Sequence, residues 1–260
     1  MRRAAAFALP ALLLAGCAAA SQAPAQTDAL TIENRYPLEY AKQFTVDVCA
    51  GGYDLITIDG SRYLVVPEGA AAPADLDADI TVLQQPIQNI YLVSSSAMDP
   101  IISIGGLGAV ALSGTQAENW YLDAARTAME QGEIAYAGKY SAPDYETILS
   151  ADCGLAIENT MIYHTPEVKE QLEKFGVPVL VERSSYESDP LARMEWVKLY
   201  GILLGRTEEA ERVFDDAVQR IAPLLDEEPT GKTAAFFSIT SNNLATVRKG
   251  CLLYTSDAAD

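Results

Sequence analysis

The sequence predicts an α/β protein with a parallel sheet, followed by one long helix and the beginning of a second sheet. From 140 to 196, capped helix starts alternate with short apolar runs and polar loops, an order typical of parallel sheets. From Thr207 to Leu225, apolar residues recur at spacings of three and four, which predicts a helix of about 27 Å. The run from Gly231 to Thr240 then predicts the first strand of a second lobe.

The N-terminus has the pattern of an exported lipoprotein. Two arginines precede an apolar run that is short for a transmembrane span. The letters LLAGC resemble a lipobox, at which a bacterial lipoprotein is cleaved and its new N-terminal Cys is acylated. We therefore expect a signal peptide over 1–16, a lipid anchor at Cys17 and a flexible tether over 17–30. The alternative is an ordinary cleaved signal with an unrelated Cys.

The last ten residues, CLLYTSDAAD, match the translation of a sequencing-library transposon adapter and have no helix or strand pattern. We expect 251–260 to be read-through on a truncated gene fragment; the alternative is a genuine C-terminus. The natural protein would then continue after Gly250. The expected domains are an N-terminal lobe over 31–206, a connecting helix over 207–227 and the start of a C-terminal lobe over 228–250.

The chain is strongly acidic. It has 18 Lys and Arg against 36 Asp and Glu, and removing the two arginines of the signal and the two aspartates of the tail leaves 16 against 34, a net charge of −18 in both cases. Such a charge repels phosphate backbones and disfavours nucleic-acid binding. Cys49 and Cys153 could pair in an exported protein or remain buried free thiols. The cysteine pattern does not indicate structural zinc.

The first part of the body predicts strands. Three β-rich runs over 44–48, 54–58 and 63–66, joined by AGGY and DGS, are typical of an antiparallel ribbon. Two further strands are expected over 79–83 and 90–93. The second of these runs directly into the polar loop SSSAMDP.

Helix boundaries are indicated by capping residues. An amphipathic helix is expected over 118–132. The expected helix starts are Ser141 with Asp144, Thr165 before Pro166 and Asp189 before Pro190, and the expected left-handed helix ends are Gly176 and Gly205.

Polar residues collect where the strands of the parallel sheet end. Residues 158–161 and 182–187 each follow an apolar run, as SSSAMDP follows the strand expected over 90–93. In open α/β sheets, ligands bind in the crevice outside the carboxyl ends of the strands. The sequence therefore predicts a binding site formed by these loops.

A lipobox, an α/β lobe, one long helix and the start of a second lobe together resemble the substrate-binding lipoproteins of ABC importers for iron siderophores, haem and cobalamin. The local matches are PDYETILSADCGLAI, similar to a helix-then-strand segment that usually ends in KPDLVI, LEKFGVPVLVE, similar to L…GIPV, and SSYESDPLARMEW, similar to a variant common in clostridial members. The segment SADCGLAIENT departs from the usual Lys-Pro-Asp. The resemblance implies two Rossmann-like lobes joined by one long helix, with the N-terminal lobe complete and the C-terminal lobe largely missing.

The resemblance also implies ligand contacts from the loops at strand ends. These contacts are Ser94, Ser95, Ser96, Met98, Tyr140, Asn159, Thr160, Met161, Ser184, Ser185, Tyr186 and Arg193. Hydroxyls, an amide, Met and Tyr suit a bulky organic chelate better than a bare ion. The Ser and Asn residues could instead serve the backbone in turns and caps. Arg193 could pair with Glu187 or Glu195 instead of an anionic ligand.

Two charged residues have further interpretations. By the resemblance, Glu146 takes the position of the glutamate that docks on an Arg of the permease. The alternative is a solvated acid that the helix dipole alone stabilises. His164, the only histidine, could be an axial metal ligand, but its place at a helix start is more typical of a capping or surface residue.

We therefore expect a monomeric solute-binding protein without catalytic activity, cofactor or metal site, lipid-anchored outside the cytoplasm at the cell surface or in the periplasm. It would deliver an iron-siderophore, haem or cobalamin-like chelate to an ABC permease. The alternatives are a secreted α/β enzyme, such as a hydrolase or a redox subunit, and a structural surface lipoprotein. GLGAVA over 106–111 fits G-x-G-x-x-A without a clear preceding strand, and a single His limits Ser/His/Asp catalysis.

Overall fold

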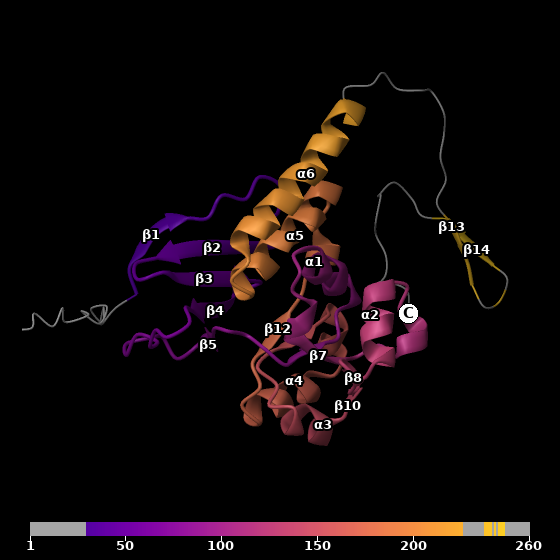
Figure 1. Cartoon of the computed structure of the whole chain (residues 1–260), viewed down its shortest axis with the longest axis horizontal. Helices are drawn as coiled ribbons and strands as arrows, with labels where there is room; N and C mark the ends of the chain where they lie inside the picture. Colours follow the sequence, from indigo (N-terminus) through magenta and orange to yellow (C-terminus); the bar gives the residue numbers. More distant parts are fainter. Residues whose placement is uncertain (1–29, 226–236, 241, 243, 248–260) are drawn as a thin grey trace, which may run out of the picture.

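The computed structural model describes residues 30–225, 237–240, 242 and 244–247. In these residues two five-stranded sheets follow one another along the chain, and the long helix α6 (Thr207–Leu225) extends away from both (Figure 1). The fold is mixed α/β with a parallel sheet, as predicted. The expected signal peptide, the anchor at Cys17, the tether and the adapter-like tail lie outside the described residues.

The first sheet is the expected ribbon, extended at both sides. Its strands, in spatial order, are β1 (Ile32–Arg35), β2 (Phe44–Cys49), β3 (Tyr53–Ile58), β4 (Ser61–Val66) and β5 (Ile80–Gln84). The first four are antiparallel, whereas β5 runs parallel to β4. The turn from β3 to β4 consists of Asp59 and Gly60, both at positive φ, which is the backbone that a two-residue hairpin of right-handed twist requires.

The second sheet contains the parallel relay that the sequence predicts. Its spatial order is β12 (Val179–Val181), β11 (Ala156–Glu158), β6 (Ile90–Leu92), β7 (Val110–Ser113) and β8 (Ala135–Tyr136). Every neighbouring pair is parallel. The short strands β9 (Gly138–Lys139) and β10 (Ala142–Pro143) form a separate antiparallel pair.

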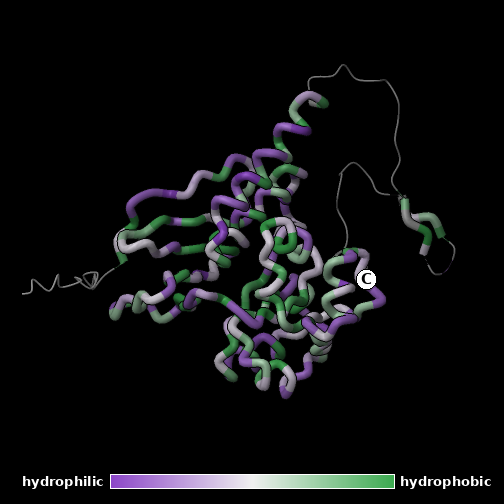
Figure 2. Tube along the Cα trace, in the orientation of Figure 1, coloured by the Kyte–Doolittle hydropathy of each residue, from purple (hydrophilic) through white to green (hydrophobic). Residues whose placement is uncertain are grey.

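Helices cover both faces of the parallel sheet. They are α1 (Met98–Ser103), α2 (Asp123–Glu130), α3 (Tyr145–Ser150), α4 (Pro166–Lys174) and α5 (Pro190–Leu203), followed by α6. Residues of α1, α2, α5 and α6 pack into one core cluster with the first sheet, and residues of α3 and α4 pack into a second cluster on the other face. In Figure 2 the hydrophobic stretches of the tube gather between these layers.

Two of the helix starts differ from the prediction. The start of α3 is capped by Asp144, which accepts the N–H of Thr147 at 3.1 Å, and not by Ser141. The expected helix over 118–132 is shorter, because Trp120 is in extended backbone and its indole donates to Ser113 Oγ at 3.2 Å in the interior. Asp189 caps α5 as expected, through the N–H of Leu191.

The other expected helix ends and the two cysteines are also described by the structure. Thr165 occupies the N-cap position of α4 before Pro166, but its hydroxyl makes no capping hydrogen bond. Gly176 and Gly205 follow helices at positive φ, as expected. Cys49 and Cys153 are buried free thiols in different core clusters, which decides between the two alternatives for them.

The second lobe is described only in part. Of the strand expected over 231–240, residues 237–239 form β13 (Phe237–Ile239), which pairs with β14 (Ala245–Val247) in an antiparallel hairpin. Phe237 and Ile239 expose more than half of their surface. This hairpin stands apart from the two five-stranded sheets (Figure 1).

Candidate ligand-binding site

The loops after β6, β11 and β12 meet because these three strands are parallel neighbours. Backbone hydrogen bonds continue the register beyond the strands, with Ser94 N bonded to Ile157 O at 3.0 Å and Glu182 N bonded to Glu158 O at 2.8 Å. A short 3-10 turn follows each strand end, at Ser95–Ala97, Thr160–His164 and Ser184–Tyr186. The expected placement of residues 158–161 and 182–187 at one edge of the sheet is confirmed.

A cavity of about 110 Å³ lies between these loops and α5. It is lined by Ser94, Ser95, Ser96, Asn159, Glu182, Ser184, Ser185 and Arg193. Seven of these residues are among the contacts predicted from the sequence. Glu182 is the exception: its acidic side chain at a strand end, inside the loop expected to line the site, was the pattern from which it could have been predicted.

Glu182 organises one wall of the cavity. Its side chain is buried, and Oε2 accepts the hydroxyls of Ser94 at 3.0 Å and Ser96 at 2.8 Å, while Oε1 accepts the N–H of Ser184 at 2.7 Å. A buried carboxylate is stable only when such donors replace its water. Ser94 Oγ and Ser96 Oγ are also 2.9 Å apart, so the two hydroxyl hydrogens are used within this cluster and oxygen lone pairs remain for the cavity.

Arg193 does not make the ion pair that was the alternative to ligand contact. Its Nη2 donates to the carbonyl oxygen of Ser185 at 2.6 Å, and its Nε is buried without a partner. Glu187 accepts the N–H groups of Lys42 and Gln43, and Glu195 pairs with Lys198. The pairing of Arg193 with either acid is therefore wrong, and the guanidinium has no counter-ion among the described residues.

The other predicted contacts lie away from this cavity. Met98 is fully buried in the first core cluster, and Tyr140 packs against the second. Thr160 is buried and Met161 half-buried, and neither lines the cavity. Tyr186 is exposed, and the guanidinium of Arg183 lies over its ring at 4.4 Å.

Glu158, at the end of the central strand β11, is buried in an apolar setting. It exposes 0% of its surface, and neither carboxyl oxygen has a hydrogen-bond partner. Side chains alternate along a strand, so Glu158 shares the face of Ala156, which belongs to the second core cluster. Burial raises the pKa of Glu158 to about 8, so its carboxyl is largely protonated at neutral pH.

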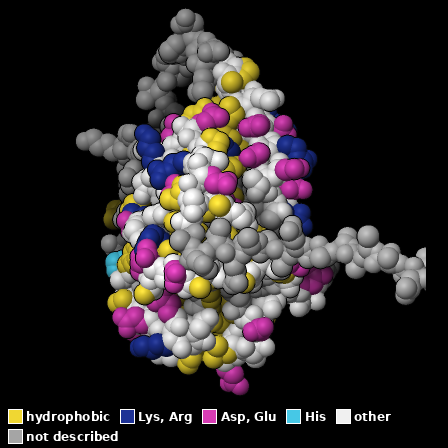
Figure 3. Space-filling model, turned by 90° about the vertical axis from the view of Figure 1, so that its left-hand side faces the viewer, with side chains coloured by type: hydrophobic (Ala, Val, Ile, Leu, Met, Phe, Trp, Pro, Cys, Tyr) yellow, Lys and Arg dark blue, Asp and Glu magenta, His cyan; other side chains and the backbone are white. Residues whose placement is uncertain are grey.

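Two charged residues singled out in the sequence lie at the surface. Glu146 is exposed in the first turn of α3, where its charge favours the helix dipole. His164 is exposed at the end of a 3-10 turn, as expected for a surface residue. Acidic side chains are spread over the face shown in Figure 3, with fewer Lys and Arg among them.

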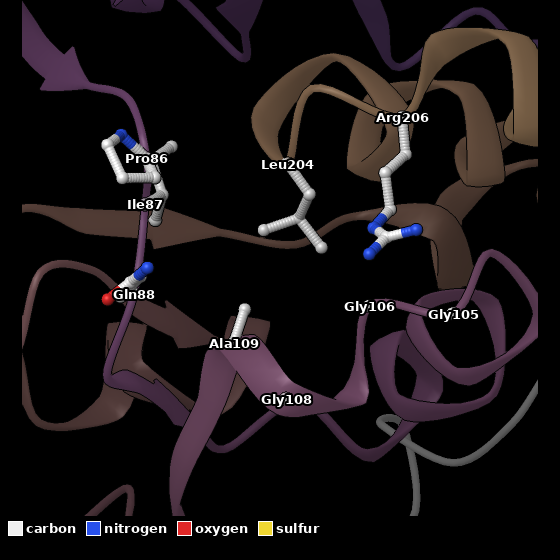
Figure 4. A pocket seen from close by; sticks show the side chains of 9 residues that line it. All are labelled: Pro86, Ile87, Gln88, Gly105, Gly106, Gly108, Ala109, Leu204 and Arg206. Carbon is white, nitrogen blue, oxygen red and sulfur yellow. The ribbon is translucent and has the colours of Figure 1, made fainter. Parts of the chain in front are cut away.

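A second cavity, of about 240 Å³, contains the glycines of GLGAVA (Figure 4). Figure 4 shows Leu204 and Arg206 pointing from the turn between α5 and α6 toward the loop of Gly105, Gly106 and Gly108. A Cβ on Gly106 would lie 2.7 Å from Leu204 Cδ1, so packing explains this glycine. The motif runs into strand β7, of which its last two residues are part, and does not lead from a strand into a helix, which a dinucleotide site requires.

The described residues contain neither a metal-binding cluster nor a membrane-spanning helix. They hold no group of three or more His, Cys, Asp or Glu side chains arranged to bind a metal ion. None of the helices in the described part of the chain has the length and apolarity to cross a membrane.

Comparisons with known proteins give distant similarities. No protein-family model matches the chain. An uncharacterized lipoprotein of Methanocaldococcus jannaschii is 21% identical over 174 residues, which are 62% of this chain and 41% of the relative.

Three similar solved structures are two periplasmic haem-binding proteins and one ABC-transporter substrate-binding protein. A haem-binding protein of Pseudomonas aeruginosa is 23% identical and covers 54% of this chain and 46% of its own, with a TM-score of 0.43. A haem-binding protein of Vibrio cholerae is 15% identical over 62% of this chain and 58% of its own, with a TM-score of 0.49. The substrate-binding protein of an iron-uptake ABC transporter from Streptococcus pneumoniae is 14% identical over 58% and 51%, with a TM-score of 0.45.

The chain spans about half the length of these solved structures and less than half of the curated relative.

Proposed function

We propose that this chain belongs to the extracytoplasmic solute-binding component of an ABC importer. In this proposal it captures a metal chelate, namely an iron-siderophore, haem or a cobalamin-like compound, and delivers it to the permease. The observation that supports this most directly is the polar cavity at the carboxyl ends of β6, β11 and β12. Ligands of open α/β sheets bind at this position.

The size of the cavity favours a site shared between two lobes. Small-molecule pockets commonly have volumes of about 300–1,000 Å³, whereas the cavity in this lobe has about 110 Å³. A chelate would therefore rest on this wall and be enclosed by a second lobe after α6. The hydroxyls and the amide that line the wall suit an organic ligand with many oxygen atoms.

Binding is favoured over hydrolysis by the hydrogen bonds of the serines. A serine nucleophile needs a neighbouring general base, most often His. Ser94 and Ser96 donate to the buried Glu182, and His164 is exposed in another loop and does not line the cavity. This arrangement supplies fixed polar contacts, and the secreted enzyme is the weaker alternative.

The proposal extends to the location and the partner of the protein. Cys17 would carry the lipid that anchors it outside the cytoplasm, and the exposed Glu146 would contact the permease. The protein would act as a monomer.

Titration of the full-length protein by calorimetry with haemin, ferric siderophores and cyanocobalamin tests this function. Haemin is titrated first, because the similar proteins of Pseudomonas aeruginosa and Vibrio cholerae are named haem-binding proteins. We expect one class of chelate to bind, and Ser96→Trp, which fills the cavity, to abolish binding. Ser103→Trp, the same change at an exposed serine outside the cavity, is the matched control. Absence of binding for every chelate, or turnover of ester substrates, would overturn the proposal.

A further inference from the structure

Some residues that line the cavity offer hydrogen-bond donors and others offer acceptors, and this division points to the charge of the ligand. We infer, on the basis of the solute-binding function proposed above, that the chelate presents an anionic oxygen group, a carboxylate above all, to Arg193 and Asn159. The inference rests on the hydrogen bonds that the cavity residues have already made within the protein.

Arg193 is a cation with unused donors. Of its five N–H groups, one on Nη2 is used by the carbonyl of Ser185, and the buried Nε–H has no partner. A half-buried guanidinium without a counter-ion is costly, because burial removes water that the protein does not replace. Its planar N–H groups match the two oxygens of a carboxylate. A carboxylate bound in this cavity would therefore supply the counter-ion that Arg193 lacks.

Asn159, which lines the cavity together with Arg193, adds a neutral hydrogen-bond donor. Its Oδ1 accepts the N–H of Met161 at 2.9 Å and so caps the 3-10 turn that follows β11. This bond fixes the orientation of the amide and leaves the Nδ2–H₂ group as the part available to a ligand. Arg193 and Asn159 together offer hydrogens and no acceptor.

The residues around Glu182 disfavour an anion. Glu182 is a buried carboxylate that takes the hydrogens of Ser94 and Ser96, so this side offers lone pairs and a negative charge. An anionic oxygen placed there would meet like charge and no donor. The same wall can accept hydrogens from hydroxyl or amide groups of the ligand. The cavity thus orients a ligand by its charge as well as by its shape.

The experiment compares ligands and variants of the full-length protein. Haemin and ferric citrate carry carboxylates, whereas the peripheral side chains of cyanocobalamin are amides and its anionic oxygen group is a phosphodiester. Arg193→Gln removes the cation, and Asn159→Asp keeps the oxygen that caps Met161 but replaces the donor with a negative charge. We expect each variant to weaken binding of the carboxylate ligand about tenfold or more, the loss typical of a charge-assisted hydrogen bond. Arg193→Lys should retain part of the affinity.

Arg206→Gln is the matched control. Arg206 is an exposed arginine that lines the second cavity, and Figure 4 shows it pointing from the turn before α6 toward the loop of Gly105 and Gly106. We expect its substitution to leave binding unchanged. Thermal unfolding of each variant checks that the fold is intact.

The outcomes separate this inference from the proposed function. Equal affinity of wild type and Arg193→Gln for the bound chelate overturns the inference and leaves the solute-binding function standing. A higher affinity for cyanocobalamin than for haemin and ferric citrate would contradict the carboxylate and leave the solute-binding function standing. Failure of haemin, ferric citrate, ferric siderophores and cyanocobalamin to bind overturns both.

Discussion

Glu195 and Lys198 form an ion pair inside the protein, with Nζ 2.8 Å from Oε1 and side-chain exposures of 0% for Glu195 and 7% for Lys198. The same carboxylate accepts the backbone N–H groups of Glu39, Tyr40 and Ala41 at 2.8 to 2.9 Å. Burial raises the pKa of Glu195, but the ammonium and the three N–H groups outweigh it and hold the pKa below its usual value. This acid of α5 thus fixes the segment between β1 and β2 of the first sheet.

Replacing Glu195 with Leu should destabilise the protein by about 3–5 kcal/mol, because it leaves a buried ammonium and three backbone donors without partners. Urea unfolding followed by circular dichroism measures this change. The control is Glu173→Leu, which removes the more exposed pair with Lys169 and should cost less than about 1 kcal/mol. Similar losses for the two variants would show that the buried pair has no special role.

The raised pKa of Glu158 should make the stability of the protein depend on pH. Its pKa is raised to about 8 in the folded protein by burial, so between its usual pKa and 8 the folded state holds a proton that the unfolded state has lost. Stability must then fall as pH rises through this range, by up to about 1.4 kcal/mol per pH unit. Below the usual pKa of a glutamate both states are protonated and the penalty disappears.

The variant Glu158→Gln cannot ionise and should lose this component. We expect the difference in unfolding free energy between Glu158→Gln and wild type to grow in favour of the variant from pH 5 to pH 8.5. Glu146→Gln, an exposed acid, is the control and should show no such trend. A difference that is constant with pH would mean that Glu158 is ionised in the folded protein.

The parallel sheet and its polar edge were predictable, because their causes are local. Short, largely apolar runs, separated by Pro166 at a helix start and Gly176 at a helix end, define β11 and β12. The loops after parallel strands must then meet at one edge. Seven of the twelve contacts expected at this edge line the cavity.

The remaining contacts depend on distant packing. Met98 follows the serine loop but turns into the core at the start of α1, and the sequence has no pattern that separates it from its polar neighbours. Glu187 and Glu195 lie within reach of Arg193 in sequence, yet they bind backbone groups about 145 to 156 residues away. These backbone groups lie between β1 and β2 of the first sheet, so the packing of that sheet against α5 determines which groups the two acids bind.

Lipid attachment at Cys17 is testable by metabolic labelling with a radioactive fatty acid. The small residues before Cys17 resemble a lipobox, so we expect the wild type to be labelled and Cys17→Ser to remain unlabelled. Cys49→Ser is the matched control, since Cys49 is a buried thiol and should not affect labelling. Equal labelling of wild type and Cys17→Ser would contradict the anchor.

Docking on the permease should depend on the charge of Glu146. This acid is exposed and does not line the candidate cavity, so Glu146→Arg should lower uptake of the chelate by whole cells and leave affinity in calorimetry unchanged. Glu133→Arg makes the same change at another exposed acid and should leave uptake unchanged. Normal uptake by Glu146→Arg would place the docking contact elsewhere.

The chain over residues 17–250 should bind the chelate much more weakly than the full-length protein. A good site buries about 70–90% of a drug-sized ligand, whereas the cavity of about 110 Å³ supplies one wall. Each 1.4 kcal/mol of lost contact weakens binding tenfold, so the loss of an opposing wall should exceed about a hundredfold. Calorimetry on both proteins measures this, with circular dichroism to check that the shorter chain is folded. Equal affinity of the two proteins would place the whole ligand site on this lobe and contradict the two-lobe arrangement.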